Sequence, residues 1–433
     1  MPVGNCRPVN PVYNCIMDNP KRSLSGHTDH LSPIDQFRNS QEYLEREAKR
    51  ALEDRRAAGL EGLVGELACV IINVEPDCQR AAVEELQHFT GLSLLGAHRG
   101  PMYITAVLSQ KETSGMGVPP MCTTGILPVS SQWCVGNSKE TAHGQDAHAT
   151  RPPAADVLVR SRRLEGNPFA SLNDRPKSRR LPNTRLETFV FECADLDRYV
   201  SIQKSRGVRF VTDEIIRMDT YSFIQTLPSR LIGASYGFIQ WTDGRTYHFG
   251  GAEDLDWNIP APRQEYRENI GRLDHVATRL NAMDRDSAIL EFVRLTNHRF
   301  EFAIYVESLN SITNVTRRSR DGVGLVFTSG IAPYLSEATA GPTEKFVYDY
   351  GPRTHHMAFE TRNIEPTYEA LRSDGMTFMV GLVGGPKEGL HQTFSDPSER
   401  TMIVTEYIHR YHGFDGYFTL SNVTALTAAS EKQ

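Results

Sequence analysis

The apolar positions of the chain follow one order four times: a strand, a helix, and then further strands. In the first copy, LACVIINV (67–74) is typical of a buried strand, and DCQRAAVEELQHF (77–89) has the apolar spacing of an amphipathic helix. LSLLGAH (92–98) and MYITAVLSQ (102–110) then predict two more strands. The other three copies begin with ETFVFEC (187–193), LDHVATRL (273–280) and THHMAFET (354–361).

Repetition of one supersecondary unit predicts both the fold class and the domain organisation. We expect an α+β fold in which paired βαβββ units form two modules, each with a curved, barrel-like mixed sheet. The first module covers residues 66–255, and the second covers residues 271–430 and includes a C-terminal helix.

Three segments lie outside this repeat. Residues 1–31 are rich in Pro, Asn, Gly and Ser and predict a flexible tail. Residues 32–65 predict a helix that begins at Ser32-Pro33 and packs on a domain or on a partner subunit. Residues 110–184 are dense in Gly, Pro, Ser and Thr, and we expect a disordered insertion within the first module. Its basic end, 151–185, suits a solvated linker better than a nucleic-acid site.

Composition narrows the function classes. The chain has 433 residues, of which 39% are hydrophobic and 23% charged, as in ordinary globular proteins. A formal net charge of −6 argues against a protein built to bind nucleic acid. The first residues lack a charged start followed by an apolar stretch, so we expect no signal peptide, and no apolar run is long enough to predict a membrane span. Seven cysteines without a C-x-x-C spacing favour a reducing, cytoplasmic location over a disulfide framework or a zinc ribbon.

The second module contains three strands that carry strong metal ligands. His275 and His356 lie in the opening strands of the third and fourth copies, and Glu406 lies in the last strand of the fourth. Two imidazoles and one carboxylate with open positions are the ligand set of a non-haem Fe(II) centre. A lone glutamate on an apolar strand face is costly unless a cation pairs with it, and an ion would meet that need.

Other histidines lie near this triad. His355 precedes His356 and points to the opposite strand face, so we expect it to face solvent or to support the ligands from behind. His409 and His412 follow Glu406 and rank below the triad, since His409 alternates away from the glutamate's face. The opening strands of the first module hold no histidine, so we expect that module to be a metal-free structural or gating partner.

The second module resembles the catalytic domain of 4-hydroxyphenylpyruvate dioxygenase, in the vicinal-oxygen-chelate superfamily. The resemblance covers roughly 160 residues. It rests on the segments LDHV, HHMAF, EGLHQTFSDP, TEYIHRYHGFDGYF and SNVTALTAA. It implies one Fe(II) ion, held by His275, His356 and Glu406. It also implies an N-terminal module of the same fold without a metal.

The resemblance also implies substrate-binding residues. These are Ser311, Gln392, Phe394, Phe414 and Asn422, with no catalytic residue beyond the metal centre. The chain departs from the family at Thr328, Pro342 and Val423, and only 50 residues separate His356 from Glu406, so the pocket is expected to be reshaped.

The function that this resemblance implies is decarboxylation coupled to hydroxylation of an aryl 2-oxo acid, as in aromatic amino acid catabolism. The partners would be the oxo acid and dioxygen, with neither nucleic acid nor a membrane, in a homodimer or homotetramer. Two alternatives stay open: a divalent-metal lyase or isomerase of the same superfamily, and a non-catalytic protein that binds a small molecule.

Overall fold

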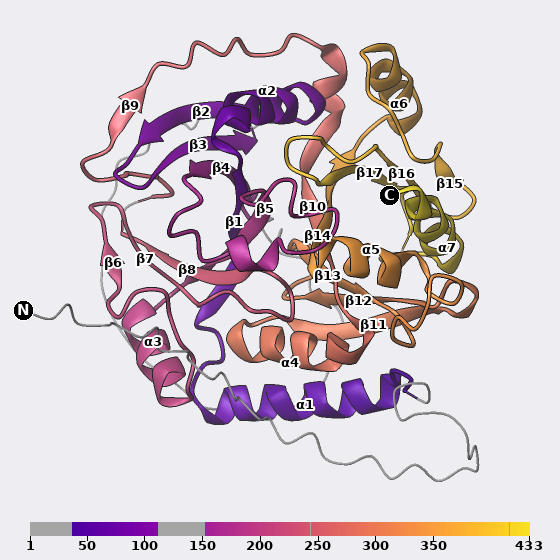
Figure 1. The fold of residues 1–433 in the computed structure, drawn as a ribbon, viewed down its shortest axis with the longest axis horizontal. Helices are drawn as coiled ribbons and strands as arrows, with labels where there is room; N and C mark the ends of the chain where they lie inside the picture. The colour runs from indigo at the N-terminus through magenta and orange to yellow at the C-terminus, as the bar shows by residue number, and fades with distance from the viewer. Residues whose placement is uncertain (1–36, 111–151, 243, 415) are drawn as a thin grey trace, which may run out of the picture. The chain divides into compact units, whose positions relative to one another are not determined.

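The computed structural model describes residues 37–110, 152–242, 244–414 and 416–433, and residues from Phe37 to Gln433 belong to one compact unit. Four βαβββ units follow one another along the chain, as predicted (Figure 1). The first contains β1 (Val64–Val74), α2 (Gln79–Phe89), β2 (Leu92–Arg99), β3 (Tyr103–Gln110) and β4 (Asp156–Arg162). The second contains β5 (Arg185–Cys193), α3 (Leu196–Ser205), β6 (Ile216–Arg217), β7 (Tyr221–Gln225) and β8 (Ser235–Trp241).

The third and fourth units have the same order of elements. The third contains β10 (Ile270–Arg279), α4 (Arg285–Leu295), β11 (Arg299–Val306), β12 (Ser311–Arg317) and β13 (Gly324–Ser329). The fourth contains β14 (Arg353–Thr361), α6 (Ile364–Ser373), β15 (Val383–Gly385), β16 (Leu390–Phe394) and β17 (Val404–Arg410). Four elements lie outside the units: α1 (Gln41–Ala57), β9 (Glu253–Leu255), α5 (Pro342–Tyr350) and α7 (Leu420–Ala429).

Each pair of units forms one mixed sheet. The first sheet has the order β6-β7-β8-β5-β1-β4-β3-β2-β9, and the second has the order β11-β12-β13-β10-β14-β17-β16-β15. At the centre of each, the two opening strands pair antiparallel, and each also pairs in parallel with the last strand of its own unit. The predicted α+β fold with two modules is confirmed.

The two modules repeat each other in detail. The β1–β5 pairing shifts register at Val64/Leu67, Leu67/Cys69 and Ile71/Ile72, and the β10–β14 pairing shifts at the three equivalent places. Because a β-bulge bends and twists the strand that carries it, both central strand pairs curve in the same way. The curvature gives each sheet one inner face around a cavity and one outer face.

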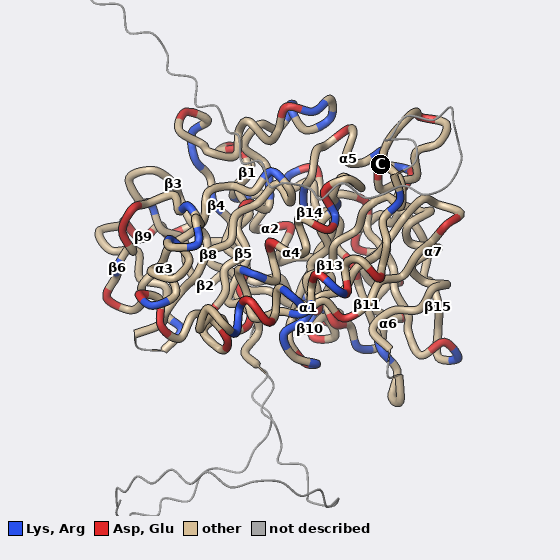
Figure 2. The backbone as a smooth tube through the Cα atoms, turned by 90° about the horizontal axis from the view of Figure 1, so that it is seen from below, with Lys and Arg blue, Asp and Glu red and all other residues tan. Residues whose placement is uncertain are grey.

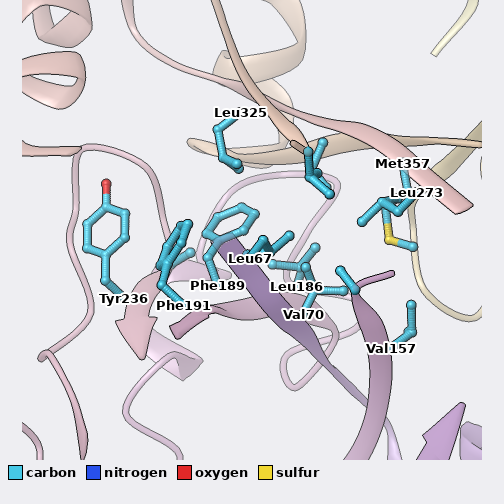
Figure 3. Close-up of a cluster of buried hydrophobic side chains, with 14 of the residues drawn as sticks. Leu67, Val70, Val157, Leu186, Phe189, Phe191, Tyr236, Leu273, Leu325 and Met357 are labelled. Atoms are coloured by element: carbon cyan, nitrogen blue, oxygen red, sulfur yellow. The ribbon is translucent and has the colours of Figure 1, made fainter. Parts of the chain in front are cut away.

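The outer faces of the two sheets share a hydrophobic core. Side chains from the first module, such as Val70 and Phe189, belong to the same buried cluster as Leu273, Leu325 and Met357 from the second (Figure 3). Strands bury alternate residues on opposite faces, and the bulges shift this alternation, so the core takes Leu67 and Val70 of β1 and Leu273 and Val276 of β10. The residues between them, including Cys69 and His275, face the inner cavities.

Helix α1 packs on α4, which confirms that the N-terminal helix lies against a domain (Figure 1). The Ser40 hydroxyl caps the helix by accepting a hydrogen bond from the backbone N–H of Tyr43 at 3.2 Å. The buried Arg55 guanidinium donates at 2.8–3.1 Å to three carbonyls at the C-terminal end of α4, that of Val293 in its last turn and those of Thr296 and His298 just beyond it. These carbonyls lack intrahelical partners, so Arg55 joins the two helices by satisfying them.

Several predicted boundaries are wrong. The N-terminal helix begins at Gln41 and not at Ser32, because Ser40 supplies the capping hydroxyl. The expected insertion over 110–184 is wrong from residue 152 onward, since β4 (Asp156–Arg162) is buried between β1 and β3. VLVRSR lies among Pro and basic residues, so its short apolar run gave only a weak strand signal. The expected tail (1–31) and residues 111–151 lie outside the described residues.

The described chain has no helix that is both long enough and apolar enough to cross a membrane. Basic and acidic positions are interspersed along the backbone in the view of Figure 2. Cys69, Cys78 and Cys193 are free thiols.

Candidate metal centre

Three strands of the second sheet bring His275, His356 and Glu406 together. His275 lies on β10, His356 on β14 and Glu406 on β17, and all three are buried. The Nε2 atoms of the two histidines lie 3.2 Å apart, and they lie 3.0 Å (His275) and 3.2 Å (His356) from Glu406 Oε2. The three donor atoms thus form a nearly equilateral triangle.

The dimensions of this triangle fit one face of an octahedron. Two ligands at right angles around a divalent ion, each about 2.1 Å from it, lie about 3.0 Å apart. Within the described residues, these three are the one group of histidine, cysteine or acidic side chains close enough to share an ion. The donors therefore fit a 2-His-1-carboxylate centre, which leaves the opposite face of the ion open.

A buried ion pair supports His275 from behind. Asp274 Oδ1 accepts a hydrogen bond from His275 Nδ1 at 2.7 Å, which directs the lone pair of Nε2 toward the triad. Burial alone would raise the pKa of Asp274, but the guanidinium of Arg410 and the His275 ring hold it well below its usual range. Burial would also lower the pKa of His275, but Glu406 and Asp274 raise it to about 9.

A chain of hydrogen bonds sets the tautomer of His356. His355 Nε2 lies 2.8 Å from Oε1 of Gln433, and His355 Nδ1 lies 2.8 Å from His356 Nδ1. Because the amide oxygen only accepts, His355 donates through Nε2 and accepts through Nδ1. His356 then donates through Nδ1, which leaves the lone pair of its Nε2 for a metal. Burial, followed by nearby positive charge, keeps the pKa of both rings well below the usual value.

A second chain connects Glu406 to helix α7. Gln392 on β16 donates to Glu406 Oε1 at 2.5 Å, and Gln392 Oε1 accepts from the side-chain amide of Asn422 at 2.9 Å. Asn422 lies in the first turn of α7, where Thr419 caps the helix. The position of α7 is therefore coupled to the carboxylate that would hold the ion.

The cavity beside the triad is small, about 50 Å³. Phe394 and Phe418 form an apolar part of the cavity wall. The Phe418 ring centroid lies 5.1 Å from that of His275. Arg279 on β10 also lines the cavity; it donates to Ser430 at 2.6 Å, and burial lowers its pKa to about 9. It remains a cation below that pH and is the one guanidinium among the residues that line this cavity.

The other predicted substrate residues lie at different distances from the cavity. Ser311 does not line it, but its hydroxyl lies 3.1 Å from that of Thr343, which does. Phe414 lies outside and packs against the cluster of Ala358, Leu390 and Ile408, while Phe418 occupies the cavity wall. Of the three departures from the family, Thr328 and Val423 line the cavity, and Pro342 begins α5.

The structure also places the three histidines next to the triad in the sequence: His355, His409 and His412. His355 is buried behind His356, so the expectation of a supporting role is confirmed and that of a solvent-facing ring is wrong. His409 Nδ1 bonds to the Thr361 carbonyl at 2.7 Å, away from the triad, and His412 is exposed. Neither joins the three donor atoms.

Sequence reasoning missed several residues of this site, among them Asp274, Arg279, Arg410, Phe418 and Gln433. Arg279 had a usable signal, because alternation along LDHVATR places it on the same strand face as His275. Arg410, the partner of Asp274, and Gln433, the partner of His355, could not be found in this way, because each is far from its partner along the chain.

The equivalent positions of the first module hold a different set of side chains. Cys69 pairs with Val190 as His275 pairs with Ala358, and Ile71 pairs with Thr188 as Ala277 pairs with His356. On the last strands, Val190 pairs with Gly237 as Ala358 pairs with Glu406. Cys69, Thr188 and Gly237 therefore stand where the second module has its two histidines and its glutamate.

No protein-family model and no curated protein sequence matches the chain. Among solved structures, a triple mutant of 4-hydroxymandelate synthase from Streptomyces coelicolor superposes with a TM-score of 0.56 at 16% identity, covering 86% of this chain and 99% of the other. A fusion protein of a xylose isomerase-like TIM barrel and 4-hydroxyphenylpyruvate dioxygenase has a TM-score of 0.56 at 13% identity. That match covers 90% of this chain and 58% of the fusion. The chain has the vicinal-oxygen-chelate fold, as the sequence predicted.

Proposed function

We propose that this protein is a mononuclear non-haem Fe(II) dioxygenase that acts on an aryl 2-oxo acid, coupling decarboxylation to hydroxylation. The observation that carries the proposal is the triangle of donor atoms from His275, His356 and Glu406, with edges of 3.0–3.2 Å. The names of the two solved structures with the same fold, a 4-hydroxymandelate synthase and a fusion containing a 4-hydroxyphenylpyruvate dioxygenase, support the same class.

The donor set suits iron in its divalent state. Imidazole and carboxylate ligands on one face are the arrangement of non-haem Fe(II) oxygenases. When bound, such an ion would supply Lewis acidity and the redox chemistry that dioxygen requires. The outer partners Asp274 and His355 keep the Nε2 lone pairs directed at the ion site, which is the usual role of outer-shell groups.

The groups around the triad suit a 2-oxo acid. The Arg279 guanidinium can pair with a carboxylate, since it is a planar donor fork that stays charged. The Gln392 amide lies between the triad and α7, where it can donate to a substrate oxygen in place of Glu406. Phe394 and Phe418 exclude water and offer ring faces to an aryl group.

Substrate binding requires α7 to move. A cavity of about 50 Å³ holds a few water molecules at most, whereas small-molecule sites measure roughly 300–1,000 Å³. Val423, Leu426 and Thr427, all on α7, form one wall. We infer that an outward shift of α7 breaks the Asn422–Gln392 bond, frees the Gln392 amide and opens the site.

The small cavity also favours a second candidate, a divalent-metal lyase or isomerase that acts on a smaller acid without dioxygen. The same donor triangle would serve it, because Lewis acid catalysis needs an open coordination position and no redox change.

Oxygen uptake by the Fe(II)-reconstituted protein tests the proposal. The panel contains 4-hydroxyphenylpyruvate, phenylpyruvate and pyruvate, with released CO₂ measured in parallel. We expect uptake and CO₂ release with an aryl 2-oxo acid, and neither without oxygen. Glu406→Gln, which keeps the side-chain volume, is the matched control and should abolish both.

Two outcomes contradict the proposal. Stoichiometric Fe(II) binding without oxygen uptake on any oxo acid would reject the dioxygenase, and anaerobic conversion of the acid would favour the lyase. Full uptake by Glu406→Gln would reject the triad itself.

A further inference from the structure

The first module contains a cavity of about 480 Å³, on the sheet face equivalent to the one that carries the triad. Its floor consists of Cys69, Ile71, Leu158, Val190 and Ile239, which belong to a hydrophobic cluster separate from the shared core. Residues near both ends of the sheet line the cavity, among them Ile216 of β6 and His98 of β2. Its volume lies in the range of small-molecule sites.

The open side of this cavity is apolar as well. Met102, Val211 and Ile216 line it and are 73%, 46% and 36% exposed. Large apolar side chains exposed together around one opening are typical of a ligand or partner site. Phe223 and Phe249 continue the apolar lining inward.

Two buried polar groups in the wall lack partners. Arg160 on β4 is 9% exposed and Thr105 on β3 is 1% exposed, and the two residues are paired in the β3–β4 register. Arg160 Nε and Thr105 Oγ1 make no hydrogen bond with any residue that the structure describes. A buried donor without a partner costs free energy, so native structures satisfy most of them, and a ligand is one way to do so.

The charge of this wall favours an anion. Arg162 is paired with the buried Glu187, whereas Arg160 NH1 stays 3.9 Å from the same carboxylate, beyond hydrogen-bond distance. One carboxylate therefore faces two guanidinium groups. The Tyr103 ring, with its centroid 4.5 Å from the Arg160 guanidinium carbon, holds that group in place.

We propose that the first module binds a small organic carboxylate with an aromatic body, whose carboxylate pairs with Arg160 and whose ring lies on the apolar floor. This site is independent of the metal centre and goes beyond the proposed function. The floor offers no ligand set for a metal ion, because Cys69 is the one strong ligand among the floor residues and burial raises the pKa of that thiol to about 12. The cavity of the first module is therefore a binding site without a metal.

Isothermal titration calorimetry with 1-naphthoate tests the proposal, with the uncharged 1-naphthylmethanol as the matched probe. We expect one naphthoate site per chain in the wild-type protein and binding at least about tenfold weaker for the alcohol, because a hydrogen bond to a charged group is lost. Arg160→Met keeps the side-chain length and should weaken naphthoate binding by a similar factor without affecting the alcohol.

Two control variants separate this site from others. Arg99→Met removes an exposed arginine of the same module, which pairs with Glu253, and should bind naphthoate like the wild type. Glu406→Gln should also bind it unchanged, since the metal centre is not involved. Naphthoate binding is measured without any oxygen uptake, so the binding site in the first module and the proposed dioxygenase function can each be rejected without the other.

Three results would overturn the proposal: no naphthoate binding to the wild-type chain, equal affinity of the acid and the alcohol, or loss of binding in Glu406→Gln. If Arg160→Met does not fold by circular dichroism, the comparison of acid and alcohol on the wild-type protein decides alone.

Discussion

The two modules share one backbone plan and differ in what their inner faces hold. In the second module, three donors meet over a cavity of about 50 Å³. In the first, a cavity of about 480 Å³ has Cys69, the counterpart of His275, in its lining, and the described residues there form no such ligand set. The bulges and strand pairings are equivalent, so the curvature of the sheet alone does not bring three donor atoms together. The identity of the side chains on the inner face makes the difference.

The first module shows what replaces the ligands. Gly237 stands at the glutamate position, and a Cβ atom there would lie 3.0 Å from the Phe223 ring and 3.1 Å from Thr188 Cγ2. The space that a carboxylate fills in the second module is therefore taken by an aromatic ring in the first. The apolar inner face of the first module therefore suits a larger organic ligand rather than a metal ion.

The largest expected effect comes from removing a metal ligand. His356→Ala should weaken Fe(II) binding by more than the roughly 100-fold that loss of an outer-shell partner causes, and oxygen uptake should fall to background. The measurement is a competition titration with a chelator. Thr188→Ala, the equivalent change in the first module, should leave Fe(II) affinity unchanged, and equal loss in both variants would contradict the comparison.

Removing the support behind His275 should cost less. Asp274→Asn keeps the shape but loses the charge that orients the ring, so we expect Fe(II) affinity about 10–100-fold lower. The control is Glu301→Gln, another acidic residue that pairs with an arginine, Arg317, in the same module. A wild-type affinity in Asp274→Asn would show that Arg410 and Asp274 act only on the fold.

Filling the glutamate position of the first module should destabilise the fold. Gly237→Ala places a methyl group 3.0–3.1 Å from three side chains, and overpacking of this kind costs about 1–3 kcal/mol of unfolding free energy. Urea denaturation measures the change. The double variant Gly237→Ala/Phe223→Leu should lose less than the sum of its single changes, whereas additive losses would place the strain elsewhere.

The last effect concerns acid stability and appears only when the pH falls below 6.5. Burial, followed by the charge of Arg318, lowers the pKa of His298 to about 3, and its ring packs on Phe191 of the first module and Phe292 of the second. Below pH 6.5 the unfolded chain binds a proton that the folded chain does not, so stability falls as pH falls toward 3. The slope is about 1.4 kcal/mol per pH unit at most.

His298→Phe removes that titration and should flatten the dependence of unfolding free energy on pH between 6.5 and 4. His412→Phe, at an exposed position, is the control and should keep the wild-type slope. An unchanged slope in His298→Phe would assign the acid sensitivity to other groups.

The sequence by itself determined the repeated βαβββ order and singled out the three side chains of the candidate metal centre. Local apolar periodicity predicts strands and helices from the sequence alone. His275, His356 and Glu406 could be identified because strong metal ligands are rare on apolar strands. Strand β4 was not predicted, because its short apolar run adjoins residues with the composition of a loop.

Only the tertiary structure decided how the ligands are held and what the first module contains. The tautomer of His356 depends on Gln433 through His355, and the charge behind His275 depends on Arg410 through Asp274, contacts that span 78 and 136 residues. Local patterns do not encode which distant side chains meet, since that follows from sheet curvature and packing. For the same reason, Phe418 rather than Phe414 faces the candidate metal centre, and Arg160, whose Nε makes no hydrogen bond with the described residues, lies over an apolar floor.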